Sequence, residues 1–229
     1  MSDLRAYVEK RKKRDPQFAR GFESGYEEFK TQEGSTMGFT LEIGRPAPQF
    51  SLRGVDGKTY ALKDFAKAKA VVVCFTCNHC PAVKGNESRE RSFVADYAPK
   101  GVAYVAINSN DLAFHPDDSF EHMKERAKRL GFTWPFLRDE TQAVAKAYGA
   151  QRTPHFFLLD AARKVVYTGR MDDNAHDITH ATTHELRDAV DALLAGKPIR
   201  VPVTEASGCN VKWRGKDAHW MPESLEDFT

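Results

Sequence analysis

The segment Cys77-Asn78-His79-Cys80-Pro81 holds the side chains of this sequence that are best suited to chemistry. Its two thiols are two residues apart and follow the apolar run 70–75, where a buried strand is expected to end and a helix to begin. Backbone N–H groups and the positive end of the helix dipole stabilise a thiolate at such a position. Because the thiolate is the form that attacks disulfides or binds metals, the spacing predicts reversible dithiol–disulfide exchange.

The two thiols are expected to have different roles. Cys77 is the predicted nucleophile, because the first cysteine of such a pair should be more exposed and closer to the helix N-terminus. Cys80 is the predicted resolving thiol, which would attack the mixed disulfide and release the product. A protonated His79 would stabilise the Cys77 thiolate and favour the reduced pair. The alternatives are an unreactive structural pair and a solvated histidine with no effect.

The other metal-binding or redox-capable residues are harder to interpret. Cys74 lies within the apolar run and is predicted to pack in the core. Cys209 is either a structural cysteine, which we favour, or a second resolving thiol brought near the site by the tail. Three of the four cysteines fall within seven residues, which favours redox chemistry or metal binding over a disulfide framework. We predict no metal site at the histidines that recur every four residues, which are His176, His180 and His184.

Composition excludes several classes of function. The chain has 229 residues, of which 41% are hydrophobic, and a formal net charge of +2, so we expect no binding to nucleic acid or to anionic membranes. No apolar stretch approaches the ~18 residues of a membrane-spanning helix. The N-terminus shows no apolar signal region, which predicts a cytoplasmic protein with reduced thiols. We also expect no bound organic cofactor.

Three regions are predicted along the chain. Residues 1–36 form a helical extension, in which aromatic residues recur at three- to four-residue spacing. This apolar stripe is expected to cover the main domain, although it could instead pair with a second copy of the chain as a homodimer. Residues 40–198 form the main domain, and residues 199–229 form a mixed C-terminal tail.

The main domain is predicted to be an α/β domain with a mixed sheet. Continuous apolar runs indicate buried strands, whereas residues 81–97 and 184–195 have the spacing of helices. The charged run 124–129 is expected to be a solvated helix face. A βαβ half followed by an antiparallel hairpin implies a central mixed sheet flanked by helices. The expected strands are 70–76, 101–107, 132–137, 156–160 and 164–169, with short strands and an Asp56-Gly57 turn before them.

Four segments together resemble the thioredoxin-like superfamily in its redoxin branch, which includes the domains similar to alkyl hydroperoxide reductase. Residues 44–52 with 56–58 resemble the opening hairpin, and 77–80 lie at the position of the redox motif. Residues 139–149 resemble the helix before the second half of the sheet, and Thr153-Pro154 precedes the next strand. The resemblance covers residues 40–198 and implies a thioredoxin-like fold with a helical extension and a tail.

The resemblance also implies an opposing wall for the thiols. It predicts a cis peptide bond before Pro154, facing Cys77, with the backbone of Thr153 open to pair with an extended substrate. The alternative is a trans proline that starts a strand. A histidine at the place of His79 occurs in a strongly oxidising periplasmic member of the superfamily. The motif is therefore predicted to be more oxidising than that of thioredoxin.

The predicted activity is that of a thiol–disulfide oxidoreductase that acts on protein or small-molecule disulfides and thiols, with an unidentified reductant. One alternative is a peroxiredoxin-like antioxidant thiol peroxidase, but the family's threonine, three residues before its cysteine, is missing here: Cys74 precedes Cys77 at that spacing. Another alternative is a Cu(I)-binding chaperone of the Sco type, whose two cysteines are one residue further apart.

Overall fold

A computed structural model describes residues 40–229, apart from residues 114, 176–177, 218, 223–226 and 228–229. The predicted helical extension 1–36 lies outside the described residues, so its helices and its suggested role in a homodimer stay predictions. The described residues belong to the compact unit Gly38–Thr229. Within them, no helix is long and apolar enough to cross a membrane.

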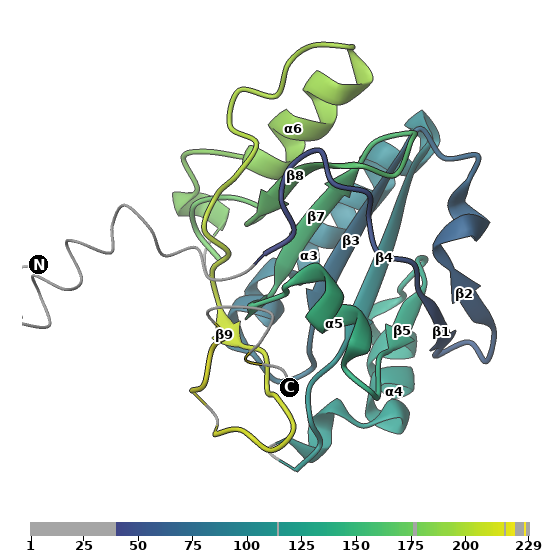
Figure 1. Cartoon of the computed structure of the whole chain (residues 1–229), viewed down its shortest axis with the longest axis vertical. Coiled ribbons are helices and arrows are strands. Elements are labelled where there is room, and N and C mark those ends of the chain that lie inside the picture. Colours follow the sequence, from purple (N-terminus) through teal and green to yellow (C-terminus); the bar gives the residue numbers. More distant parts are fainter. Residues whose placement is uncertain (1–39, 114, 176–177, 218, 223–226, 228–229) are drawn as a thin grey trace, which may run out of the picture. The chain divides into compact units, whose positions relative to one another are not determined.

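The core of the protein is a seven-stranded mixed sheet with the strand order β2-β1-β5-β4-β3-β7-β8 (Figure 1). Strands β3, β4 and β5 are parallel to one another, and the other neighbouring pairs are antiparallel. The strands are β1 (Ser51–Gly54), β2 (Thr59–Ala61), β3 (Ala70–Thr76), β4 (Val102–Asn108), β5 (Phe136–Arg138), β7 (His155–Leu159) and β8 (Val165–Gly169). The predicted mixed α/β sheet is therefore confirmed.

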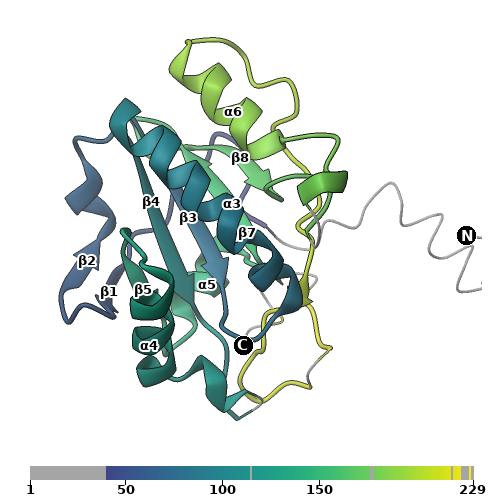
Figure 2. The ribbon, with the colours of Figure 1, turned by 180° about the vertical axis from the view of Figure 1, so that it is seen from behind.

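Every residue of β3 is buried, and side chains alternate between the two faces of a strand. Both faces of the sheet are therefore covered, in each case by helices. Helices α3 (Pro81–Tyr97), α4 (Phe120–Leu130) and α6 (Glu185–Leu194) pack on the face of Val72 and Cys74 (Figure 2). Helix α5 (Ala143–Tyr148) packs on the face of Val71 and Val73. The prediction that Cys74 is a core residue is confirmed, since its side chain is fully buried.

The C-terminal tail is part of the packed structure. Val211 and Trp213 are buried in the same core cluster as α5. A second, two-stranded sheet joins β6 (Arg152–Thr153) to β9 (Cys209–Asn210), which the sequence did not predict. Figures 1 and 2 show the tail passing the end of the sheet at which α3 begins. The tail therefore reaches the region of the two thiols.

The aromatic packing of β3, α5 and β7 should dominate the stability of the core. Phe157 is fully buried and lies edge-on against the rings of Phe75 and Tyr148. We expect Phe157→Ala to lower the free energy of unfolding by about 3–5 kcal/mol, because it leaves a cavity among rings that cannot collapse into it.

Denaturant unfolding measures this change, with Val201→Ala as the control. Val201 is 50% exposed, and its truncation should change the free energy by less than about 0.5 kcal/mol. Equal effects of the two substitutions would contradict the assignment of the core.

Candidate active site

Cys77 and Cys80 lie in the loop that joins β3 to α3. The buried strand ends at Thr76, Cys80 is the N-cap residue of α3, and Pro81 occupies its first turn, where a missing N–H costs no helix hydrogen bond. The expectation that Cys77 is the more exposed thiol and the closer to the helix N-terminus is wrong. Both side chains are fully buried, and the N-cap is Cys80.

The two thiols differ in the charge that their surroundings favour. Burial raises the pKa of Cys77 well above its ordinary value, and the nearby Cys80 and Asp118 raise it further. The pKa of Cys80 is lowered to about 4, first by the hydrogen bond from the Cys77 thiol, which together with other donors outweighs the effect of burial. Those other donors are the Cys209 thiol and the backbone N–H groups of Val83 and Cys209. These donors favour a negative charge on Cys80, whereas the Thr153 carbonyl oxygen, 3.2 Å from that sulfur, accepts a hydrogen bond only from the protonated thiol.

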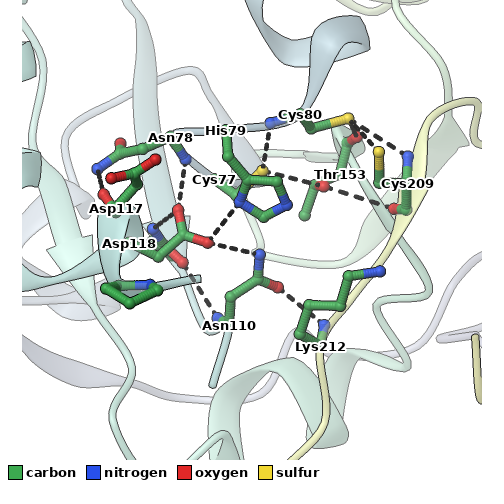
Figure 3. A network of polar contacts seen from close by, with 12 residues as sticks. Cys77, Asn78, His79, Cys80, Asn110, Asp117, Asp118, Thr153, Cys209 and Lys212 are labelled. Atoms are coloured by element: carbon green, nitrogen blue, oxygen red, sulfur yellow. Dashed lines mark hydrogen bonds and ion pairs between the residues drawn. The ribbon is translucent and has the colours of Figure 1, made fainter. Parts of the chain in front are cut away.

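Thr153 and Pro154 face this pair across the site. The peptide bond between them is cis, which confirms the prediction from the resemblance. The Thr153 hydroxyl lies 3.3 Å from the Cys77 sulfur, and the Thr153 carbonyl oxygen lies 3.2 Å from the Cys80 sulfur (Figure 3). One residue thus contacts both sulfurs, through its side chain and through its backbone.

The prediction that the backbone of Thr153 is open to pair with a substrate is wrong for this structure. Strand β6 pairs in antiparallel register with the chain's own β9, and Thr153 lies opposite Cys209. This pairing was missed because a strand of two residues leaves no recognisable periodicity in the sequence. The predicted substrate position is therefore occupied by the tail in this structure.

Cys209 lies directly against the redox pair. Its sulfur is 2.9 Å from the sulfur of Cys80, and its backbone N–H donates to the same atom over 3.4 Å (Figure 3). The sequence left open a structural cysteine and a second resolving thiol brought near the site by the tail. The structure places three sulfurs together, with Cys80 in contact with Cys209.

His79 is held by a buried carboxylate that sequence reasoning missed. Its Nδ1 lies 2.8 Å from Oδ2 of Asp118, which is fully buried. Asp118 also accepts hydrogen bonds from the backbone N–H of Asn78 and the side chains of Asn108 and Asn110. An acidic residue in a short 3-10 helix such as Pro116–Asp118 gives no sequence signal for such burial.

The hydrogen bonds around Asp118 keep it ionised. Burial alone would raise its pKa, but the hydrogen bonds from His79, Asn78 and Asn110 outweigh burial and leave the pKa below its ordinary value. The ring of His79 also stacks on that of His115, with centroids 3.5 Å apart. His79 is thus fixed in place by a charge on one side and a ring on the other.

These groups could also hold a metal ion. One potential ligand atom from each of Cys77, His79 and Asp118 lies within 4.8 Å of the other two. Thiolate and imidazole suit Zn²⁺ or copper. However, both oxygens of Asp118 already accept two hydrogen bonds each, which leaves the carboxylate poorly available as a ligand.

Arg126 secures the loop that carries the pair. The run 124–129 was expected to be a solvated helix face, but Arg126 is buried, so this expectation is wrong at that position. Its guanidinium donates to the carbonyl oxygens of Cys77 and Asn78 over 3.1 and 2.8 Å, and to Glu87 over 2.8 Å. The planar fork of arginine lets one side chain bridge α4, α3 and the loop.

Comparisons with known proteins agree with this fold. A sequence model described as Redoxin matches residues 42–187. The thiol-disulfide oxidoreductase ResA of Bacillus thuringiensis is 29% identical over 126 residues, which are 55% of this chain and 68% of that protein. An uncharacterized conserved protein from Geobacillus kaustophilus is 43% identical, with a TM-score of 0.73 over 77% of this chain and 95% of that one. A hypothetical protein from Sinorhizobium meliloti is 38% identical, with the same TM-score over 78% of this chain and 98% of that one.

The charge on Cys80 can be tested directly. In the reduced protein we expect one thiolate that titrates with a pKa of about 4, because four donors surround that sulfur. Ultraviolet absorbance of the thiolate, followed against pH, measures it. Cys80→Ser should remove this transition, whereas Cys74→Ala should leave it. A wild-type protein whose thiolates appear only near the ordinary pKa of about 8.5 would contradict the assignment.

Proposed function

Because this chain belongs to the Redoxin family, we propose that it is a thiol–disulfide oxidoreductase that cycles between a Cys77–Cys80 dithiol and disulfide. One observation carries the proposal: two sulfurs lie together at the end of β3, where burial favours a thiol at Cys77 and hydrogen bonds favour a thiolate at Cys80. Relatives named thiol-disulfide oxidoreductase support this class of reaction.

The exchange uses the two sulfurs in sequence. Cys77 loses its proton and attacks a substrate disulfide, which forms a mixed disulfide and releases the first substrate thiolate. The thiolate of Cys80 then attacks the Cys77 sulfur and releases the second thiolate, leaving the Cys77–Cys80 disulfide. The Cys209 thiol and the backbone N–H groups of Val83 and Cys209 still donate to Cys80 at this stage and favour its thiolate. The substrate gains two electrons and the protein loses two, and the reverse sequence oxidises a dithiol.

His79 and Asp118 support the first step. A ring nitrogen of His79 lies within 4.8 Å of the Cys77 sulfur, so the imidazole can take the Cys77 proton through one bridging water, and the carboxylate of Asp118 orients the ring through Nδ1. The resulting imidazolium is stabilised by that carboxylate and in turn stabilises the thiolates of the reduced pair. This arrangement supports the interpretation of His79 as a residue that tunes the reduction potential.

The substrates of the proposed reaction are protein or small-molecule disulfides and thiols, with a separate reductant that restores the pair. The site supports exchange in either direction. Action in the cytoplasm stays a prediction from the sequence, as does any homodimer formed through the N-terminal region.

Copper binding is the second candidate, and one observation favours it: Cys77 and His79 place a soft sulfur and a nitrogen within reach of one ion. Equilibrium dialysis of the reduced protein with Cu(I) tests it. Stoichiometric retention that is lost in His79→Ala, in a protein without disulfide exchange, would favour a metal carrier over the enzyme.

Substitution of each thiol separates the two roles. We expect Cys77→Ser to abolish catalytic turnover of a disulfide substrate, because the Cys77–Cys80 disulfide can no longer form. We expect Cys80→Ser to accumulate a mixed disulfide on Cys77, because the resolving sulfur is gone. Mass spectrometry of the trapped species and a thiol-release assay measure both effects.

Cys74→Ala is the matched control, since that thiol is buried in β3, and it should keep full exchange. Wild-type thiols inert to glutathione buffers would overturn the proposed activity. Rapid consumption of hydrogen peroxide that disappears in Cys77→Ser would instead support the peroxidase.

The reduction potential tests His79. The reduction potential of thioredoxin is about −270 mV, and we expect the Cys77–Cys80 pair to be more oxidising than this. We expect His79→Ala to lower the potential of the pair by about 30 mV, which corresponds to losing ~1.4 kcal/mol of stabilisation of the reduced form. Equilibration with glutathione buffers of known potential measures it. The exposed His122 provides the control, His122→Ala. Equal potentials for wild type and His79→Ala would show that His79 has no effect.

A further inference from the structure

The tail presents Cys209 to the redox pair much as a bound substrate strand would present a cysteine. Cys209 is the register partner of Thr153 in the β6–β9 pair, and its sulfur is 2.9 Å from that of Cys80. The length of a disulfide bond is about 2.05 Å, so the two sulfurs must approach by only about 0.9 Å to form one. A small side-chain movement is enough for this.

The position of Cys209 is fixed by its neighbours. Gly208 has φ +139°, and a Cβ there would lie 2.2 Å from the Thr153 carbonyl oxygen, so only glycine allows the tail this close. On the other side, Val211 donates its backbone N–H to the Gln151 carbonyl over 3.0 Å. The Asn210 side chain accepts from Arg152 over 2.6 Å. Cys209 is therefore held between two anchored neighbours.

Access from outside also differs among the three sulfurs. The side chains of Cys77 and Cys80 are fully buried, whereas Cys209 is partly exposed. An external thiol that approaches this surface thus finds Cys209 as the accessible member of the cluster. In the return step, electrons from an outside thiol would therefore reach the buried pair through Cys209.

We propose that Cys209 is a third redox-active sulfur, which takes over the disulfide from the Cys77–Cys80 pair; this rests on the proposed function. The Cys209 thiolate attacks the sulfur of Cys80, the Cys80–Cys209 bond forms and the Cys77–Cys80 bond breaks. Cys77 leaves with the electron pair and takes up the proton that Cys209 lost. Cys209 is oxidised and Cys77 is reduced, so no further oxidant is needed.

The return step uses the exposed sulfur. A thiolate from outside, such as glutathione or a partner dithiol, attacks Cys209, and Cys80 leaves as a thiolate. The low pKa of Cys80, about 4, makes it a good leaving group. The pKa of Cys209 is raised to about 11 by burial and then by its hydrogen bond to Cys80. That second cause disappears once Cys80 is in a disulfide with Cys77, which favours the attack by Cys209.

Peptide mapping distinguishes the two disulfides. Trypsin is expected to release Cys77 and Cys80 together in peptide 70–84, and Cys209 in peptide 201–212. The full-length protein is equilibrated in glutathione buffers, alkylated and digested without reduction. We expect peptides 70–84 and 201–212 to be joined in part of the oxidised protein. Recovery of peptide 201–212 only as alkylated thiol, across buffers in which 70–84 gains its internal disulfide, would overturn the relay and leave the proposed function intact.

A second variant tests the bond without the first half of the cycle. Cys74→Ala combined with Cys77→Ser leaves Cys80 as the one thiol of peptide 70–84. Oxidised glutathione should still join 70–84 to 201–212 in this protein, and Cys209→Ser should abolish the link. The variant could form this link while the wild-type protein never forms the internal disulfide of peptide 70–84. That pair of results would mean that the proposed function fails and that the Cys80–Cys209 bond stands. No link in this variant would contradict the proposed reach of Cys209.

Glycine substitutions test the geometry. Gly208→Ala should lower the yield of joined peptides by about tenfold or more, since it displaces the tail and reduces the effective concentration of Cys209 at Cys80. Gly215→Ala is the control: Gly215 also has a positive φ, +74°, but has nothing within 4 Å of a Cβ. Equal yields from the two variants would show that the close approach at Gly208 does not direct the reaction. Circular dichroism checks that both remain folded.

Discussion

A buried sulfur can carry a negative charge only where hydrogen-bond donors replace the water it has lost, and the site depends on this constraint at Cys80. The donors come from two distant parts of the chain: the Cys77 thiol and the Val83 backbone from the loop and α3, and the Cys209 thiol and backbone from the tail. The charge therefore requires β3, α3 and the tail to meet at one point. The all-buried β3 and the core residues of the tail bring them there.

A second layer of polar groups supports this point. Arg126 satisfies the carbonyl oxygens of the loop, and Asp118 organises His79 and the neighbouring asparagines. Each of these charges is buried, and each is matched by hydrogen bonds to groups that would otherwise lack partners. The loop between β3 and α3 is thereby fixed in one conformation, which a reaction between closely placed sulfurs requires.

The parts of this protein that follow from local patterns could be predicted from its sequence. The apolar run of β3, the helix start at Pro81 and the order of the other elements gave the mixed sheet, and the resemblance gave the cis bond at Pro154. The parts that depend on distant contacts could not. Asp118 and Arg126 lie in polar stretches of the sequence and Cys209 is isolated in the tail, and their burial or position is set by segments far along the chain. The missed β9 pairing also reversed the expectation about Thr153.

The pairing of β9 with β6 has a consequence for the choice of partner. An extended peptide can pair with the backbone of Thr153 only in molecules from which β9 has separated. The apparent dissociation constant of the peptide equals its intrinsic dissociation constant divided by the fraction of molecules in which β9 has separated. The affinity for extended peptides therefore falls as the tail pairs more tightly. A small thiol that reaches the partly exposed Cys209 meets no such competition. Pairing of the tail with β6 thus lowers the affinity for extended peptides relative to small thiols.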